Sequence, residues 1–207
     1  MARDAALTKK KLLNAARQEF AAHGMTGARV DRIAELAGVN KERVYGHFGN
    51  KEGLFAATVG AALDELAEAV SKPGEDVAQW VGSIYDFHRE RPELLRLLLW
   101  EALQHTDDEL PGEQERAARY SVKVDTLATQ LGVPAGPDAA ATLLCLIGLA
   151  AWPSAVPQLA RLVVGPHADT PHTQAVVRDR VVYLAGHMVD GIRSEGREQA
   201  GGDTVAR

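Results

Sequence analysis

The sequence predicts an all-α protein, in which a small three-helix N-terminal module precedes a larger helical region. Ala and Leu, which favour helices, together number 57 residues, against 33 for Val, Ile and Thr, which favour strands. Apolar residues recur every three or four positions along most of the chain, which is the spacing of one helix face. Gly and Pro separate these periodic stretches, so helices joined by short turns are expected.

The first three helices are predicted from apolar spacing and from residues that favour helix ends. The first is expected over 8–23, with Thr8 as N-cap and Gly24 closing it. A short second helix ends at Gly38, a residue suited to a left-handed turn, and Asn40 caps the third. Three residues between the second and third helices are typical of a helix-turn-helix. A tight corner formed for packing alone fits the bare spacing equally well.

Charge is distributed unevenly along the chain. Residues 1–55 hold ten Lys and Arg against six Asp and Glu, a net charge of +4, which leaves -9 for the rest of a chain with a total of -5. This asymmetry indicates a basic module on an acidic body, which suits contact with a polyanion. A chance fluctuation among solvated side chains explains the same count.

The residue types of the third helix favour the DNA-binding interpretation. Opposite the apolar face formed by Val44 and Phe48, the helix presents side chains that donate to phosphates and base edges. They are Lys41, Arg43, Tyr45 and His47.

Residues 12–55 closely resemble the DNA-binding domain of the TetR family of bacterial transcriptional regulators. The matching positions are Ala15-Ala16, Phe20, Gly24, Val30, Ile33-Ala34, Ala37-Gly38-Val39, Tyr45, His47-Phe48, Lys51-Glu52 and Leu54. Two positions depart from the family pattern. Arg29 replaces the usual Thr or Ser at the entry of the second helix, and Gly46 replaces a larger polar or aromatic residue in the third. The operator sequence of a relative is therefore not transferable.

Arg43 is the main candidate for direct base readout, because a guanidinium pairs bidentately with guanine and discriminates by about 1 to 3 kcal/mol. Glu42 either accepts a hydrogen bond from cytosine or tunes its neighbours. Tyr45, His47 and Lys51 are assigned mainly to phosphates. The full predicted DNA-binding set is Arg29, Lys41, Glu42, Arg43, Tyr45, His47 and Lys51.

The chain is expected to divide into a DNA-binding domain over 1–51, a helical effector-binding and dimerisation domain over 52–195, and a disordered tail over 196–207. A fourth helix is expected from Lys51 to about residue 71, where Pro73 and Gly74 follow. Further helices are expected over 75–90, 92–105, 113–131, 137–152, 154–164 and 171–195.

Two of these helices have more apolar width than a surface helix needs. The resemblance implies that the excess is buried against a second copy, giving a homodimer with an intersubunit four-helix bundle. Burial inside one subunit is the alternative. The residues assigned to the interface are Ala140, Leu144 and Gly148 on one helix and Val181, Leu184 and Met188 on the other.

Aromatic residues concentrate in the middle of the chain. The resemblance implies a pocket for a small-molecule effector there, and amphipathic rings suit its walls, although most such rings in proteins are core. The residues assigned to effector binding are Trp80, His88, Trp100, His105 and Tyr120.

Several other functions lack support in the sequence. The longest apolar run, 139–152, is shorter than the roughly 20 residues of a membrane span, and no export signal is recognised, so a cytoplasmic protein without membrane contact is expected. Cys145 has no charged neighbour to activate its thiol. Motifs of hydrolases, zinc proteases, P-loop proteins and dinucleotide-binding proteins are absent, so no enzymatic activity, metal or cofactor is expected.

These observations predict a ligand-responsive transcriptional regulator that binds double-stranded operator DNA as a homodimer. Repression of a pseudo-palindromic operator, with release by a small molecule, is the expected mode. One alternative is a helical small-molecule-binding protein or enzyme whose first three helices are only structural. Another is a dimeric DNA-binding protein that has no effector.

Overall fold

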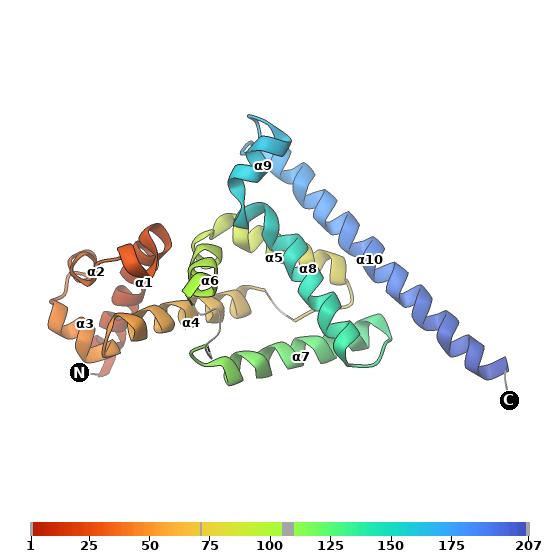
Figure 1. The fold of residues 1–207 in the computed structure, drawn as a ribbon, viewed down its shortest axis with the longest axis horizontal. Helices are drawn as coiled ribbons and strands as arrows, with labels where there is room; N and C mark the ends of the chain where they lie inside the picture. Colours follow the sequence, from red (N-terminus) through yellow and green to blue (C-terminus); the bar gives the residue numbers. More distant parts are fainter. Residues whose placement is uncertain (1, 71, 105–109, 206–207) are drawn as a thin grey trace. The chain divides into compact units, whose positions relative to one another are not determined.

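The computed structural model describes residues 2–70, 72–104 and 110–205, and these residues form ten helices and no β-strand (Figure 1). The helices are α1 (Ala2–Gly27), α2 (Val30–Ala37), α3 (Lys41–Phe48), α4 (Lys51–Ala69), α5 (Val77–Glu90), α6 (Glu93–Gln104), α7 (Glu113–Leu131), α8 (Pro137–Ala155), α9 (Pro157–Val164) and α10 (Pro171–Val205). The all-α prediction is confirmed for the described part of the chain.

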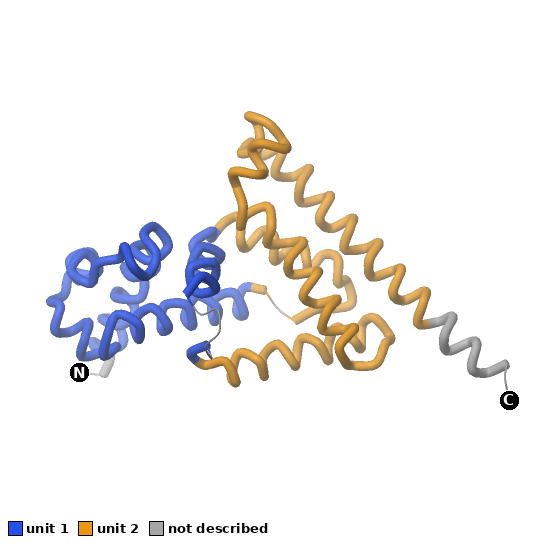
Figure 2. Tube along the Cα trace, in the orientation of Figure 1, with its two compact units in different colours: residues 1–69, 91–111 blue, residues 70–90, 112–207 orange. Residues whose placement is uncertain are grey.

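The chain packs as two compact units, which Figure 2 distinguishes by colour. Unit 1 contains residues 1–69 and 91–111, and unit 2 contains residues 70–90 and 112–207. Helices α4 and α6 therefore pack with the first three helices. The predicted division after residue 51 separates the helix-turn-helix from α4, whereas packing joins them.

Unit 1 has an apolar core to which all five of its helices contribute. The rings of Phe20 on α1 and Phe55 on α4 meet edge to face, with their centroids 5.1 Å apart. Such contacts between rings add to the free energy gained by burying their apolar surface. The largest side chains that are fully buried in this unit are Phe20, Leu12, Ile33, Leu54, Leu97, Val44, Val59 and Thr58.

Gly24 bends α1 at the position where the sequence predicts its end. Its φ of 63° and ψ of -175° are not helical, and the chain then turns for a further three residues to Gly27. A Cβ at this position would lie 2.8 Å from the ring of Trp100 on α6. Gly24 is therefore required both by its positive φ and by the close approach of that indole.

Unit 2 is built around α5, which packs against α8 and α10. Val181, Ala185 and Val189 form the buried stripe of α10. Helices α5 and α10 come close at Gly82, where an added Cβ would lie 2.8 Å from Cγ2 of Val182. An ion pair between Arg178 Nε and Asp86 Oδ2, 2.7 Å apart, flanks this contact.

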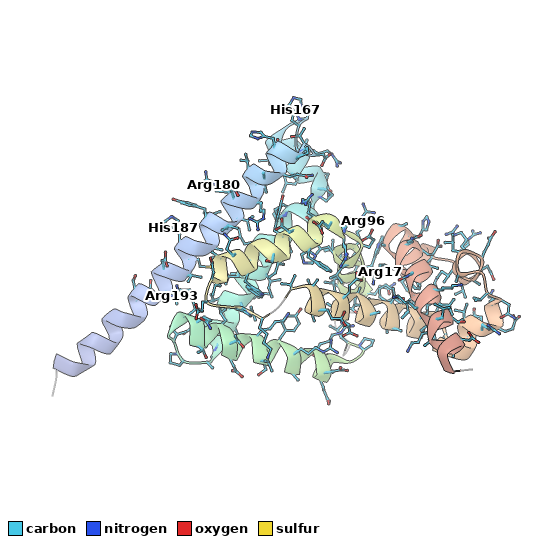
Figure 3. All side chains as sticks on the ribbon, turned by 180° about the vertical axis from the view of Figure 1, so that it is seen from behind. Arg17, Arg96, His167, Arg180, His187 and Arg193 are labelled. Carbon is cyan, nitrogen blue, oxygen red and sulfur yellow. The ribbon has the colours of Figure 1, made fainter. Side chains whose placement is uncertain are left out.

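The far half of α10 is joined to α7 by Arg193, which is labelled in Figure 3. Its Nη2 and Nε donate to the backbone carbonyl oxygen of Gln130, at 2.9 and 3.1 Å. Two charge-assisted hydrogen bonds to one carbonyl orient α10 along the end of α7.

Several helix ends differ from their predicted positions, among them one end each of α1, α8 and α10. Helix α1 begins at Ala2, so Thr8 lies inside it and is no N-cap. Helix α8 continues through Pro153 to Ala155. Helix α10 continues through Gly196 to Val205, because a glycine weakens a helix without ending it when the flanking residues remain helical. Thr170 caps the start of α10 as predicted, since its Oγ1 accepts from Thr173 N at 3.3 Å.

Helix α8 is unusually apolar for a helix that its own chain leaves mostly uncovered. The helix has 19 residues, and an 18-residue window within it has a mean hydropathy of 1.4, of which 22% is buried, so by length and composition alone the helix is long enough to cross a membrane. The helix is longer than the apolar run 139–152, because the residues on both sides of that run are also helical. An apolar surface of this kind needs a cover.

Candidate nucleic-acid interface

The turn between α2 and α3 has the predicted chemistry. Gly38 adopts a φ of 66° and its N–H donates to carbonyl oxygens of the last turn of α2. Val39 N donates to Ala34 O at 3.0 Å, which closes the end of the helix. Asn40 then caps α3, because its Oδ1 accepts from Arg43 N at 3.1 Å. Both helix ends at the turn are therefore fixed by local hydrogen bonds.

Helix α3 buries one face and exposes the other. Val44 is 1% exposed, whereas the side chains predicted to contact DNA are exposed: Lys41, Glu42, Arg43, Tyr45 and His47. Among the described residues the Arg43 guanidinium has no hydrogen bond or ion pair, so its donors are available to a ligand.

Lys41, which is predicted to contact DNA, is paired with a carboxylate in the structure. Its Nζ lies 2.7 Å from Oδ1 of Asp31 on α2, and this hydrogen bond raises the pKa of Lys41. Both side chains are exposed, so the pair adds little to stability. It does hold the ammonium toward α2 rather than leaving it free at the tip of α3.

A buried carboxylate fixes the start of α2. Glu19 of α1 is 5% exposed, and its Oε1 accepts from Arg29 N at 2.8 Å and from Arg32 Nη2 at 2.6 Å. Burial alone would raise the pKa of Glu19, but the hydrogen bonds from Arg32 and Arg29 and the charge of Arg32 hold it below its ordinary value. The helix-turn-helix is thereby tied to α1.

Arg29 and Lys51 occupy helix starts. Arg29 is the extended N-cap residue of α2, and its exposed side chain makes no cap hydrogen bond. Its backbone N–H donates to Glu19 Oε1, and this attachment to α1 does not depend on the side chain at position 29. Lys51 begins α4, directly after Asn50, whose Oδ1 accepts from Gly53 N at 2.7 Å.

An open groove of about 560 Å³ runs between the start of α1 and α3. Carboxylates, donors and small side chains share it, so its surface has mixed polarity. It is lined by Asp4, Ala5 and Thr8 of α1, by the capping residue Asn40, and by Glu42, Arg43, Gly46 and His47 of α3.

Helix α4 is fastened within unit 1 through Glu65. One carboxylate oxygen of Glu65 lies 2.6 Å from Nη1 of Arg17 on α1, and the other lies 2.8 Å from Nη1 of Arg91, just before α6. Arg17 is labelled in Figure 3. One carboxylate bridging two guanidinium groups links three parts of the unit that are distant in sequence.

The predicted effector residues that the structure describes divide between the two units. Trp80 and His88 are buried on α5 in unit 2, whereas Tyr120 on α7 is 41% exposed. Trp100 belongs to unit 1 and packs on Gly24, and its assignment to an effector pocket stays a prediction. His105 lies outside the described residues.

His88 is a buried base whose Nδ1 has no hydrogen-bonding partner within the described part of the chain. Its side chain is 3% exposed, and burial lowers its pKa from 6.5 to about 4. The ring contacts Phe87 edge to face, with the centroids 5.7 Å apart. The imidazole is therefore neutral in the folded chain at neutral pH.

The low pKa of His88 makes stability depend on pH. The unfolded chain binds a proton near pH 6.5 and the folded chain only near pH 4, so stability is lost as the pH falls through this window. When the pH is lowered from 7.5 to 4.5, we expect the free energy of unfolding of the wild type to fall by about 2 to 3 kcal/mol more than that of the His88→Leu variant. Urea unfolding of both proteins at one protein concentration measures this difference, and an equal pH response in both would contradict it.

The predicted dimer residues fall into two groups. Ala140, Leu144 and Gly148 on α8 are exposed, as are Leu184 and Met188 on α10. Val181 is 4% exposed within its own unit and belongs to the stripe that packs inside that unit, and its assignment to an interface stays a prediction. Further exposed apolar side chains on the same two helices are Trp152, Val176 and Tyr183.

Two positioning residues, Glu19 and Arg32, were not anticipated from the sequence. Glu19 directly precedes the core residue Phe20 and lies on the inward side of α1, and a charged residue at an inward position indicates a buried partner. That signal identifies Glu19 but not Arg32, because the partner is set by how α1 and α2 pack.

Helix α3 is capped at its start and exposed on one face, and α2, which precedes it, is attached to α1. This arrangement defines a helix-turn-helix DNA-binding protein. Residues 12–58 match the family described as bacterial regulatory proteins, tetR family. Residues 76–182 match the one described as Tetracyclin repressor-like, C-terminal domain.

Similar proteins agree with these matches. The HTH-type transcriptional repressor SCO4008 of Streptomyces coelicolor is 41% identical over 79% of this chain and 87% of its own. The putative transcriptional regulator SCO4942 of Streptomyces coelicolor superposes with a TM-score of 0.73 at 32% identity, covering 87% of this chain and 97% of its own. The chain belongs to the TetR family of bacterial transcriptional regulators.

The fold is shared with more distant proteins. The regulator FadR of Bacillus subtilis, solved in complex with stearoyl-CoA, superposes with a TM-score of 0.60 at 19% identity. The match covers 85% of this chain and 96% of that one, and at this identity it concerns the fold alone.

Proposed function

We propose that this regulator is a cytoplasmic repressor that binds a pseudo-palindromic operator as a homodimer, rather than an enzyme. The observation that carries the proposal is the exposed guanidinium of Arg43, which is unpaired among the described residues, on a helix whose start is capped by Asn40. A fixed helix that presents a free guanidinium is suited to bidentate pairing with guanine in the major groove.

The exposed apolar residues of α8 and α10 support the homodimer. Leu144 is 71% exposed and Trp152 58% exposed, so two large apolar side chains of this apolar helix lie open on its surface. A second copy that presents the same two helices buries them in a twofold four-helix bundle. This cover accounts for the apolar character of α8 without a membrane.

A dimer places two α3 helices on one duplex. Twofold symmetry repeats the recognition helix, so the centres of the two half-sites must be about 34 to 36 Å apart, or a multiple of that distance. Contacts to phosphates strengthen both half-sites and make affinity fall steeply with salt.

Release by a small molecule follows from the same geometry. A molecule that binds unit 2 more tightly in the released conformation changes the spacing of the two α3 helices and weakens operator binding. A 100-fold loss requires a preference of about 2.7 kcal/mol. Buried His88, with an unpaired Nδ1, offers a neutral hydrogen-bonding group for such an effector. Tyr120 on α7 is exposed and offers a second contact.

The Arg43→Ala variant tests the assignment of direct readout. We expect it to lose about 1 to 3 kcal/mol of preference at one base pair per half-site, because one bidentate contact to guanine is removed. Affinity for duplexes that differ only at that base pair, measured by titration at constant salt, checks this result.

Lys51→Ala serves as the comparison for a phosphate contact. It should weaken binding to all duplexes alike and flatten the salt dependence, since it removes one charge without removing a base contact. The readout assignment is wrong if Arg43→Ala leaves both affinity and base preference as in the wild type.

A further inference from the structure

We propose that Gly46 is a specificity-determining residue: the missing side chain at the centre of the outward face of α3 lets base edges enter the groove beside it. The inference deepens the proposed function, because it concerns how the same helix reads the operator. It is carried by the position of Gly46 on α3, by its free surroundings and by the polarity of the groove.

Helix geometry places Gly46 at the middle of the exposed face. Val44 and Phe48 form the inward face of α3, and at about 100° per residue Gly46 points directly opposite the midpoint between them. Glu42 and Arg43 lie on its two sides, about 40° and 60° away around the helix. The position that would enter the major groove most deeply therefore has no side chain.

Packing does not require glycine at this position. Gly46 has no positive φ, and a Cβ built on it meets no atom of the described residues within 4 Å. Gly38, in contrast, has a φ of 66° at the turn before α3. Glycine within a helix lowers helix stability relative to alanine, so the residue weakens α3 without a compensating contact inside the chain. A local rule broken without a structural gain is typical of a functional position.

The groove that contains Gly46 suits base edges better than phosphates. Two carboxylates, Asp4 and Glu42, line it and would repel a phosphate. Arg43 and His47 supply donors in the same groove. Base edges in the major groove present both acceptors and amino donors, and carboxylates accept from cytosine amino groups while guanidinium groups donate to guanine.

The test compares two glycine substitutions, Gly46→Ala and Gly60→Ala. Gly60 lies within α4, and a Cβ there also meets no atom within 4 Å, so it is a matched control outside α3. Both variants are expected to raise Tm by about 2 to 4 °C, because alanine favours the helix. Each is titrated with the duplex that the wild type selects from a random library and with an unrelated duplex.

We expect Gly46→Ala to bind the selected duplex at least about tenfold more weakly than the wild type, through loss of base contacts, and to bind the unrelated duplex unchanged. Gly60→Ala should bind both duplexes as the wild type does. Equal binding of the selected duplex by Gly46→Ala and wild type overturns the inference alone. An equal loss on both duplexes also overturns it, since phosphate contacts would then be affected. A wild type that selects no sequence overturns the proposed function itself.

Discussion

Replacing Leu144 by aspartate is expected to convert the proposed homodimer to monomers and to reduce operator affinity by more than about 100-fold. Leu144 is 71% exposed in the isolated chain and lies on the face of α8 formed with Ala140 and Gly148. In the proposed bundle an aspartate there would be an unpaired, desolvated charge, which costs several kcal/mol. The twofold interface repeats the cost, and a monomer retains only one recognition helix.

Sedimentation equilibrium at a fixed protein concentration measures the association state, and titration with an inverted-repeat duplex measures binding. Leu162→Asp is the matched control: it makes the same change at a residue that is 82% exposed on α9, outside the proposed interface. The control is expected to stay dimeric. The account of the interface fails if the Leu144→Asp variant remains dimeric under the conditions in which the wild type is dimeric.

Replacing Glu19 by alanine is expected to destabilise unit 1 by about 2 to 4 kcal/mol. The substitution removes the buried acceptor of Arg29 N–H and the partner of Arg32, whose Nε and Nη2 lie 2.9 and 2.6 Å from Oε1. Arg32 is 42% exposed and regains some hydration, so the loss stays below that of a fully buried pair. Operator affinity should fall as well, because the start of α2 is no longer held to α1.

Urea unfolding at pH 7 measures the loss. Glu19→Gln should lose less than Glu19→Ala, since its amide oxygen still accepts from Arg29 N–H although the charge is gone. In the wild type the lowered pKa of Glu19 means that its contribution is present above the unfolded pKa of 4.5 and is lost as the pH falls below it. Glu35→Ala, at an exposed position of α2, is the control. A loss at Glu19 no larger than that control would contradict the positioning role.

The sequence predicts most of the fold because the signals that decide helix ends are local. Gly38 and Asn40 set the ends of α2 and α3 through their own backbone conformation and side-chain reach, independently of the rest of the chain. Thr8 fails as a helix start because the residues before it are also good helix formers, so a competent cap has no effect within a longer helix.

The parts that escape prediction depend on which helices meet. Lys41 is predicted to contact DNA from its type and position, but its pairing with Asp31 depends on the angle between α2 and α3. Val181 belongs to one of two apolar stripes on α10, and only the packing of α5 decides which stripe is inside. Trp100 resembles a cavity aromatic by type, but the bend at Gly24 gives its ring a partner within unit 1.

Selection of duplexes from a random library by the wild-type chain shows whether two symmetry-related α3 helices recognise the operator. We expect enrichment of an inverted repeat whose half-site centres are about 10 to 10.5 base pairs apart, or a multiple of this spacing. The affinity for this repeat should fall steeply as the salt concentration increases. Enrichment of no sequence, or of a single motif without its inverted copy, would contradict recognition by two symmetry-related α3 helices.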